Sequence, residues 1–219
     1  MAPLAEPSLR ESSWYVWHAP YDALDSVETD RLSAVQDVLG EALDGSPAGP
    51  LRVVSACAGQ ARDLLPVLIH HPRGRDVTAR LIELDPLNAA FLDGALVSTR
   101  LTGVEVVRAD AGETSAYAGA VPADLVLLCG VFANVDPGDA ARTAQILPCL
   151  CRPGGLVVWS TYGAAGTGPV RVNAVLGENG FVPVAVREPA DRGWTVGAHR
   201  FTGRSRPLPD STRFFRFVS

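Results

Sequence analysis

The stretch LRVVSACAGQARD, residues 51–63, predicts a short apolar strand that turns sharply into a helix. Small residues at positions 56–59 and 61 allow the backbone to turn tightly and to approach a ligand closely. A helix starting near residue 61 would point its free N–H groups at that ligand. The glycine pattern of a dinucleotide loop and the lysine of a phosphate loop are both absent. A ligand loop and a tight packing turn are therefore equal alternatives for this segment taken alone.

Strands and helices alternate on both sides of this stretch. Apolar periodicity and capping residues predict helices at 25–43, 61–71, 86–99, from 137, and at 169–179. Apolar runs predict strands at 51–56, 77–85, 104–110, 123–130 and 154–162, with a possible terminal strand at 214–218. The last long runs, 181–189 and 194–203, follow each other without a helix and should pair antiparallel. This order predicts a doubly wound α/β sheet with helices on both faces, whose ligands bind at the carboxyl ends of the strands.

Two acids stand at such strand ends. Asp85 ends the second strand, where it could accept hydrogen bonds from a ribose diol, cap the helix that begins at Pro86, or do both. Glu83 shares its strand face but lies deeper, so it is the weaker candidate. Asp110, followed by Ala111, ends the third strand and could accept the amine of an adenine, with an ordinary loop acid as the alternative.

The fourth and fifth strands end in residues that could shape a pocket. The small residues Cys129 and Gly130 leave space above the sheet for a reacting centre, and Phe132 could pack against an adenine or a substrate. Tyr162 ends the fifth strand and is a further pocket candidate. His199, on the penultimate strand, has an even chance of facing the pocket by alternation.

Together these features resemble the class I S-adenosylmethionine-dependent methyltransferases over about residues 50–203. The segments WHAPYD, SACAGQARDL, CGVFANV, LCRPGGLVVW and VGAHRFTG more narrowly resemble a group of small actinobacterial methyltransferases, mostly of unassigned substrate. The resemblance implies a seven-stranded sheet of order 3-2-1-4-5-7-6 with strand seven antiparallel. It also implies S-adenosylmethionine as cofactor, S-adenosylhomocysteine as product, and these cofactor-binding residues: Ser55, Ala56, Cys57, Gly59, Asp85, Pro86, Asp110, Ala111, Cys129, Gly130 and Phe132.

The loop departs from the pattern of that family. An acid, a spacer and GxGxG would fall on Ser55, Cys57, Gly59 and Ala61, so only the central glycine is present. The acid that often receives the methionine amino group is a serine here. Cysteine and alanine are still small enough for close approach, and backbone carbonyls near Cys57 could take the ammonium group.

Residues 1–49 are expected to form an arm and a helix that cap the cofactor-binding core of residues 50–219. The arm carries several aromatic residues together with His18 and Tyr21, and in this fold such a segment commonly closes over the cofactor as a lid. His18 could act as a general base, with a packed aromatic cluster as its alternative role, and Tyr21 is the second candidate at the reacting methyl.

Composition narrows the class of function. The 219 residues are 47% hydrophobic and carry a net charge of −5, which disfavours nucleic acid and favours a small-molecule substrate. No long apolar run or signal pattern is present, so we expect no membrane association and a cytoplasmic monomer or homodimer. The four cysteines lack zinc-site spacing, and we expect no metal. A non-catalytic methyltransferase-like partner and, more remotely, a nicotinamide-dependent oxidoreductase are the alternative functions.

Overall fold

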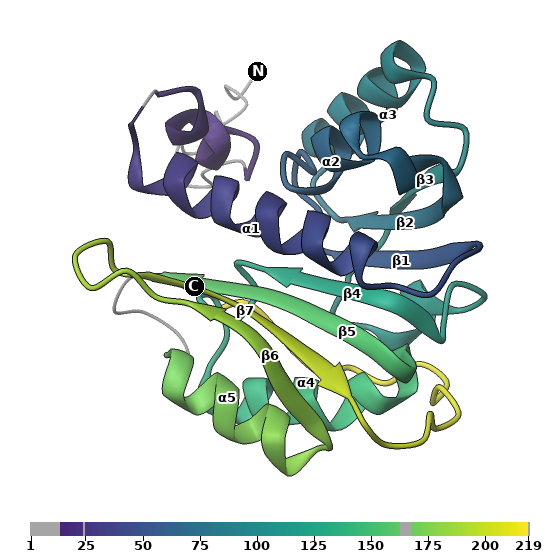
Figure 1. The fold of residues 1–219 in the computed structure, drawn as a ribbon, viewed down its shortest axis with the longest axis vertical. Coiled ribbons are helices and arrows are strands. Elements are labelled where there is room, and N and C mark those ends of the chain that lie inside the picture. Colours follow the sequence, from purple (N-terminus) through teal and green to yellow (C-terminus); the bar gives the residue numbers. More distant parts are fainter. Residues whose placement is uncertain (1–13, 24, 163–167, 219) are drawn as a thin grey trace, which may run out of the picture.

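The computed structural model describes residues 14–23, 25–162 and 168–218, and these form one seven-stranded sheet (Figure 1). The strand order is β3-β2-β1-β4-β5-β7-β6, and β7 runs antiparallel to both of its neighbours. The predicted order and the antiparallel strand are confirmed. The strands are β1 (Leu51–Ala56), β2 (Val77–Glu83), β3 (Val104–Arg108), β4 (Ala123–Cys129), β5 (Cys151–Tyr162), β6 (Phe181–Arg187) and β7 (Trp194–Phe201).

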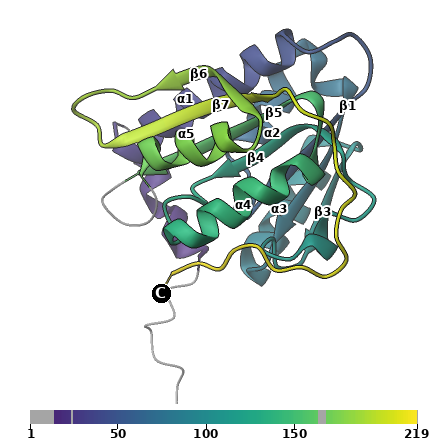
Figure 2. The same cartoon turned by 90° about the horizontal axis from the view of Figure 1, so that it is seen from below.

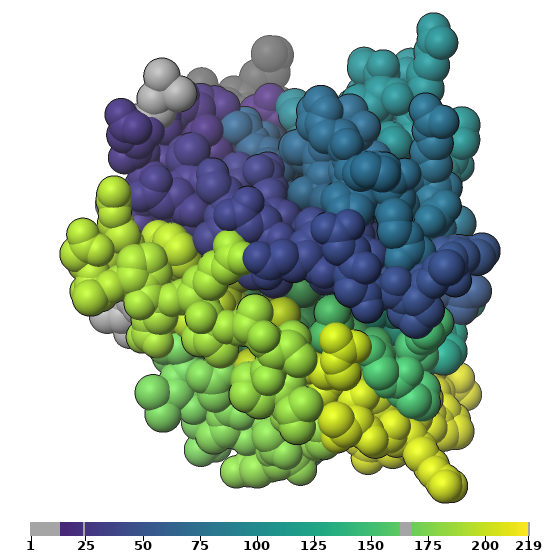
Figure 3. All heavy atoms as spheres, in the orientation of Figure 1, coloured from purple at the N-terminus to yellow at the C-terminus, as the bar shows by residue number. Residues whose placement is uncertain are grey.

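Helices cover both faces of the sheet (Figures 1 and 2). One face carries α1 (Val27–Asp44), α2 (Leu64–His70) and α3 (Pro86–Thr99), and the other carries α4 (Pro137–Leu150) and α5 (Pro169–Glu178). Figure 3 shows α1 lying between β6 and α2 on this side of the molecule. Short 3-10 helices complete the set: η1 (Val16–Asp22), η2 (Pro72–Asp76) and η3 (Thr114–Tyr117).

Polar caps explain where the helices begin. Ser26 accepts a hydrogen bond from the Thr29 amide at the start of α1, and Asp136 accepts one from Asp139 at the start of α4. Asp85 does the same for α3, with Pro86 in the first helical position. β2 therefore ends at Glu83, two residues before its predicted end, because residue 85 already belongs to the helix cap.

Other boundaries differ from the sequence prediction. The helix expected from residue 61 begins at Leu64, because residues 57, 59 and 61 all adopt positive φ angles that no α-helix accommodates. β3 ends at Arg108, and β5 begins at Cys151, three residues early. The strand expected at 214–218 is absent from the described residues, and the isolated bridge between Glu113 and Arg213 lies just before this segment.

Two apolar clusters, one on each face, hold the sheet and helices together. Leu39, Leu43 and Leu92 lie in the cluster under α1, α2 and α3, and each buried leucine contributes about 1.5–3 kcal/mol. The opposite cluster contains Trp159, whose indole packs against Gly197 so closely that an added Cβ would lie 2.5 Å from the ring. The Trp159 indole on β5 can therefore lie over its neighbour on β7 only because residue 197 has no side chain.

His199 belongs to that second cluster and not to the pocket. It is buried on β7, where its Nδ1 accepts a hydrogen bond of 3.1 Å from the Trp159 indole N–H. Its Nε2 has no hydrogen-bond partner within the described part of the chain. Burial lowers the pKa of His199 to about 4, so the ring is neutral near pH 7.

The C-terminal segment runs across the carboxyl ends of the strands. It is attached to the loop after β3, where the Phe214 amide donates to Gly112 O at 2.9 Å, and to the loop after β4, where the Val218 amide donates to Asn134 O at 2.7 Å. The aromatic rings of Phe214 and Phe215 are buried against the sheet. No helix among the described residues is long and apolar enough to cross a membrane.

Candidate functional site

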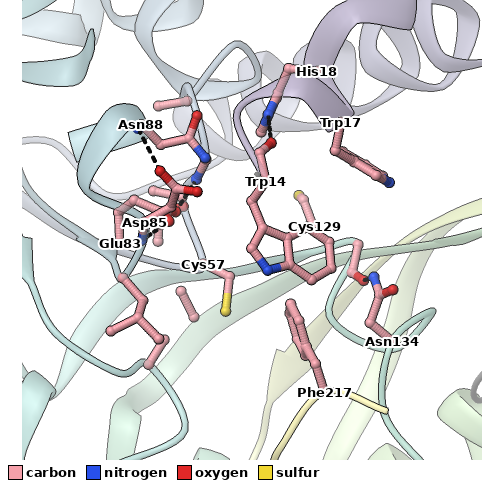
Figure 4. A pocket seen from close by; sticks show the side chains of 18 of the residues that line it. Trp14, Trp17, His18, Cys57, Glu83, Asp85, Asn88, Cys129, Asn134 and Phe217 are labelled. Carbon is pink, nitrogen blue, oxygen red and sulfur yellow. Dashed lines mark hydrogen bonds between the residues drawn. The ribbon is translucent and has the colours of Figure 1, made fainter. Parts of the chain in front are cut away.

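A cavity of about 480 Å³ lies at the carboxyl ends of β1, β2 and β4, between η1, α1 and the C-terminal segment. Its size and its mixture of aromatic, small and charged lining residues suit a small organic ligand. Figure 4 shows Trp14 reaching from the arm toward Phe217, with Cys57 and Cys129 close to its ring. Twelve of the sequence-predicted site residues line it: His18, Tyr21, Ser55, Ala56, Cys57, Gly59, Asp85, Pro86, Asp110, Ala111, Cys129 and Gly130.

Phe132 is the predicted site residue that the structure does not bring to this cavity. Its side chain is 0% exposed and packs edge to face against Trp159, with ring centroids 6.2 Å apart. The turn after β4 directs the ring back under the sheet, where hydrophobic burial favours it. We therefore remove Phe132 from the candidate ligand contacts.

The loop after β1 keeps the backbone of a glycine-rich loop although two glycines are replaced. Cys57, Gly59 and Ala61 have φ angles of 52°, 56° and 46°, all in the left-handed region. This conformation costs about 1–2 kcal/mol for a residue with a side chain, so the fold tolerates strain at Cys57 and Ala61. The alternation of left-handed residues is what makes the chain turn tightly here and leaves its backbone open to the cavity.

Gly59 is the point where the loop meets the arm. A Cβ at this position would overlap the His18 imidazole, with ring atom Cε1 at 2.7 Å. Glu83 fixes the loop from the other side, because its two oxygens accept from the Gly59 amide at 2.6 Å and the Asp85 amide at 2.8 Å. Glu83, the weaker sequence candidate, thus positions both the loop and the end of β2.

Beside Asp85, the structure reveals a polar residue that the sequence prediction missed. Asp85 Oδ1 accepts from the backbone amides of Leu87 and Asn88, as a helix cap does (Figure 4). The Asn88 side chain lines the cavity and is 0% exposed, yet neither its oxygen nor its nitrogen has a hydrogen-bond partner among the residues that the structure describes. An unsatisfied buried amide costs about 1–3 kcal/mol, which a ligand with donors and acceptors would recover. The sequence contained a signal for Asn88, because it lies about one helical turn after Asp85 and therefore on the same face of the helix.

Asp110 lies at the other end of the cavity floor. Its Oδ1 accepts from the Gly112 amide at 2.8 Å and its Oδ2 pairs with Arg213 at 2.7 Å. Arg213 also pairs with Glu113 at 2.7 Å, so the C-terminal segment is attached to this wall by charge as well as by backbone bonds. Ala111, next in sequence, is buried against the floor.

The arm presents His18 in a defined protonation pattern. Its Nδ1 lies 2.8 Å from the Trp14 carbonyl oxygen, which can only accept, so Nδ1 carries the proton and Nε2 is left as the acceptor. Burial lowers the pKa of His18, with Arg62 adding to that effect. The neutral ring therefore predominates at pH 7 and can take up a proton.

Tyr21 has a different character. Its hydroxyl accepts a hydrogen bond from Arg31, a residue of α1. Burial raises the pKa of Tyr21 to about 12, so the phenol stays protonated at neutral pH. Tyr21 can orient neighbours and shape the cavity, and it is not a base under these conditions.

The two cavity cysteines are neutral as well. Burial raises the pKa of the Cys57 thiol and that of the Cys129 thiol, which also lies against the Asp63 carboxylate. Because the thiolate is the reactive form of cysteine, neither is a nucleophile near pH 7. Their contribution to the cavity is small size and, for Cys129, a hydrogen bond.

Three comparisons with known proteins were informative to different degrees, and the solved structures bear on the fold. No protein-family model and no curated protein sequence matches the chain. Among solved structures, it resembles magnesium protoporphyrin IX methyltransferase from Synechocystis with bound S-adenosylmethionine (TM-score 0.68, 12% identity, 88% of this chain and 92% of the other).

A second similar structure is 1,6-didemethyltoxoflavin-N1-methyltransferase from Burkholderia thailandensis (TM-score 0.61, 20% identity, 93% of each chain). The cyclase SpnF is also similar (TM-score 0.58, 12% identity, 80% and 81%). At these identities the likeness establishes the fold, and activity has to be argued from the site itself. The chain has the fold of the S-adenosylmethionine-dependent methyltransferases.

Proposed function

We propose that the protein transfers a methyl group from S-adenosylmethionine to a small-molecule nucleophile. The observation that carries this proposal is the set of polar groups at the carboxyl ends of β1 and β2. There the loop after β1, whose residues have positive φ angles, and the buried Asn88 amide without hydrogen-bond partners among the described residues lie near Glu83 and Asp85. A nucleoside with a ribose diol supplies both donors and acceptors for such groups.

The cofactor roles follow from position. In this proposal Asp85 accepts from the ribose hydroxyls, while Asp110 and Ala111 contact the adenine edge. Ser55, Ala56, Cys57 and Gly59 let the backbone approach the sulfur, and Cys129 and Gly130 leave room beside it. In this proposal Pro86 and Asn88 also contact the cofactor, and Phe132 does not.

When bound, S-adenosylmethionine would supply a sulfonium methyl group to the nucleophile by an in-line displacement in which the methyl–sulfur bond breaks and S-adenosylhomocysteine is the leaving group. The protein has to align the acceptor at about 3–3.5 Å and, for a hydroxyl or a protonated amine, remove a proton. His18 Nε2 is the group in the arm that can accept that proton. The lowered pKa keeps the ring neutral at pH 7, and the proton on Nδ1 is donated to the Trp14 carbonyl oxygen, which leaves Nε2 as the acceptor. Tyr21 shapes the pocket and holds Arg31.

The acceptor side of the cavity is aromatic. Trp17 contacts both Tyr21 and Tyr162, with ring centroids 5.8 Å apart in each case, and Asn134 donates to the Tyr162 hydroxyl at 3.2 Å. These walls favour a compact, partly planar acceptor. The cytoplasmic location and the monomeric or homodimeric state stay predictions from the sequence.

Ligand-dependent melting tests the proposal. S-adenosylmethionine and S-adenosylhomocysteine should raise the melting temperature, since a ligand at a hundred times its dissociation constant adds about 2.7 kcal/mol. NADH should not. Stabilisation by NADH alone would favour the oxidoreductase alternative. Stabilisation by adenosyl ligands, without methyl transfer to any compound in a broad acceptor panel, would favour the non-catalytic partner.

A matched pair of variants locates the ligand. Asp85 and Asp136 each cap a helix that continues with proline, but only Asp85 lines the cavity. Both Asp85→Ala and Asp136→Ala should lose about 1 kcal/mol of stability through the cap. Only Asp85→Ala should also weaken S-adenosylmethionine binding, by about 1.5–3 kcal/mol. Equal affinities for the two variants would remove Asp85 from the site.

A further inference from the structure

A buried arginine faces the cavity without an acidic partner. Arg31 on α1 is 4% exposed, yet it makes no ion pair with the residues that the structure describes. Its Nη1 donates to Ser160 Oγ at 2.9 Å, its Nη2 donates to the Tyr21 hydroxyl, and its guanidinium lies 4.5 Å from the Tyr162 ring centroid. Burying a cation in this way is unfavourable unless an anion pairs with it.

A carboxylate faces the same cavity without a cationic partner. Asp63 follows the loop after β1 and accepts from the Leu64 amide at 2.8 Å and from the Cys129 thiol. No ion pair joins it to the described part of the chain. Its surroundings desolvate it, which raises its pKa, as expected for an acid that lacks a counter-charge.

A short polar connection links the two charges across the ends of β4 and β5. Ser160 Oγ accepts from Arg31 and from the Gly130 amide, the latter at 3.0 Å, and its hydroxyl contacts the Cys129 thiol. Cys129 in turn contacts Asp63. Both side chains line the cavity, and the charge of Arg31 favours the ionised Asp63 although no ion pair joins them among the described residues.

The ligand chemistry that satisfies both groups is an α-amino acid, with its carboxylate at the arginine and its ammonium at the aspartate. We propose that Arg31 and Asp63 together bind the amino-acid end of the adenosyl cofactor, an inference that rests on the proposed function. Asp63 then provides, from the far end of the loop, the negative charge that Ser55 does not provide at its start.

The sequence contained a signal for Arg31 that its charge concealed. It precedes Val35 by four residues and Val38 by seven, so it lies on the buried face of α1. Its guanidinium is also the contact between α1 and the arm, through Tyr21. Binding at Arg31 is therefore expected to favour the docked position of the arm.

Calorimetric titrations with four probes test the clamp: S-adenosylhomocysteine, its decarboxylated analogue, its deaminated analogue, and 5′-methylthioadenosine, which lacks the whole amino-acid end. The wild type should bind S-adenosylhomocysteine about 10- to 100-fold more tightly than 5′-methylthioadenosine. Arg31→Met should lose the part of that factor that the carboxylate contributes, so it should weaken S-adenosylhomocysteine binding and leave the decarboxylated analogue unchanged. Asp63→Asn should lose the part that the ammonium contributes, so it should weaken S-adenosylhomocysteine binding and leave the deaminated analogue unchanged.

Matched controls come from a surface ion pair that includes α1. Arg187 and Asp37 pair at 3.1 Å outside the cavity, and Arg187→Met and Asp37→Asn should leave all four affinities unchanged. Arg31→Lys keeps the charge without the fork and should lose less than Arg31→Met. Unchanged binding of 5′-methylthioadenosine shows that each variant is folded.

The outcomes separate the two proposals. If the wild type binds no adenosyl probe, the proposed function fails and the clamp with it. If the probes bind, but Arg31→Met and Asp63→Asn weaken all of them equally or none of them, the clamp alone is wrong. Loss confined to the matching charge on each probe supports it.

Discussion

Replacing Gly59 by alanine tests how the arm sits on the loop. The new Cβ would overlap the His18 ring, with Cε1 at 2.7 Å where ordinary contact begins at 3.4 Å. The ring would have to retreat by about 1 Å, given the usual separation of packed atoms. It cannot do so without loosening its 2.8 Å bond to the Trp14 carbonyl, which contributes about 0.5–1.5 kcal/mol.

The backbone adds to this cost, because φ is +56° at Gly59 and a side chain there costs about 1–2 kcal/mol. We expect Gly59→Ala to lose about 2–3 kcal/mol in all, equivalent to a melting temperature lower by about 4–12 °C. Acrylamide should also quench tryptophan fluorescence more strongly, since Trp14 and Trp17 are in the arm while Trp159 and Trp194 are buried.

Gly94→Ala is the matched control. Gly94 lies within α3, nothing stands within 4 Å of its added Cβ, and alanine there should stabilise the helix by about 0.5–1 kcal/mol. The reasoning would be refuted if Gly59→Ala melted at the wild-type temperature and kept the wild-type quenching constant. That result would mean that the arm does not rest on Gly59 in solution.

Three further predictions concern other groups. His199→Asn keeps a hydrogen-bond acceptor for Trp159 but removes the titrating ring. Because the pKa of His199 falls from about 6.5 in the unfolded chain to about 4 in the folded one, lowering the pH from 6.5 to 4 should reduce the wild type's free energy of unfolding by about 3 kcal/mol more than the variant's. Urea titrations at the two pH values measure this, and equal losses would contradict it. Asp110→Asn should discriminate less between S-adenosylhomocysteine and its inosine analogue, and unchanged discrimination would make Asp110 an ordinary loop acid. Deleting residues 1–22 should abolish turnover of an identified substrate while the core still melts cooperatively, and His18→Ala should slow it about 10²-fold; full activity of the truncated protein would contradict both the lid and the base.

The sequence predicted those features that local physics determines. Alternating apolar runs were enough for a sheet with helices on both faces, and Asp85 before Pro86 was enough for a helix start at the mouth of the site. The order of the strands followed from the resemblance to the methyltransferase family and not from the runs themselves. The small residues of the loop predicted a tight turn, although not that Cys57 and Ala61 would keep left-handed angles.

The misses come from long-range packing. Phe132 was expected at the ligand, but the direction of its ring depends on Trp159, a residue from another strand. The roles of Asn88 and Arg31 depend on what lies opposite them, which no local pattern contains. The C-terminal segment has no periodicity, and its course is fixed by single contacts such as that of Arg213 with Asp110.

The walls of the cavity come from both extremes of the described chain, residues 14–21 and residues 213–217. Trp14 and Phe217 even touch, with ring centroids 5.2 Å apart. Contacts that span so many residues form late, because the intervening loop has to be closed first. The sheet can therefore form before the cavity does. A ligand that contacts both segments would bind only the fully folded protein and would slow unfolding that begins at either terminal segment.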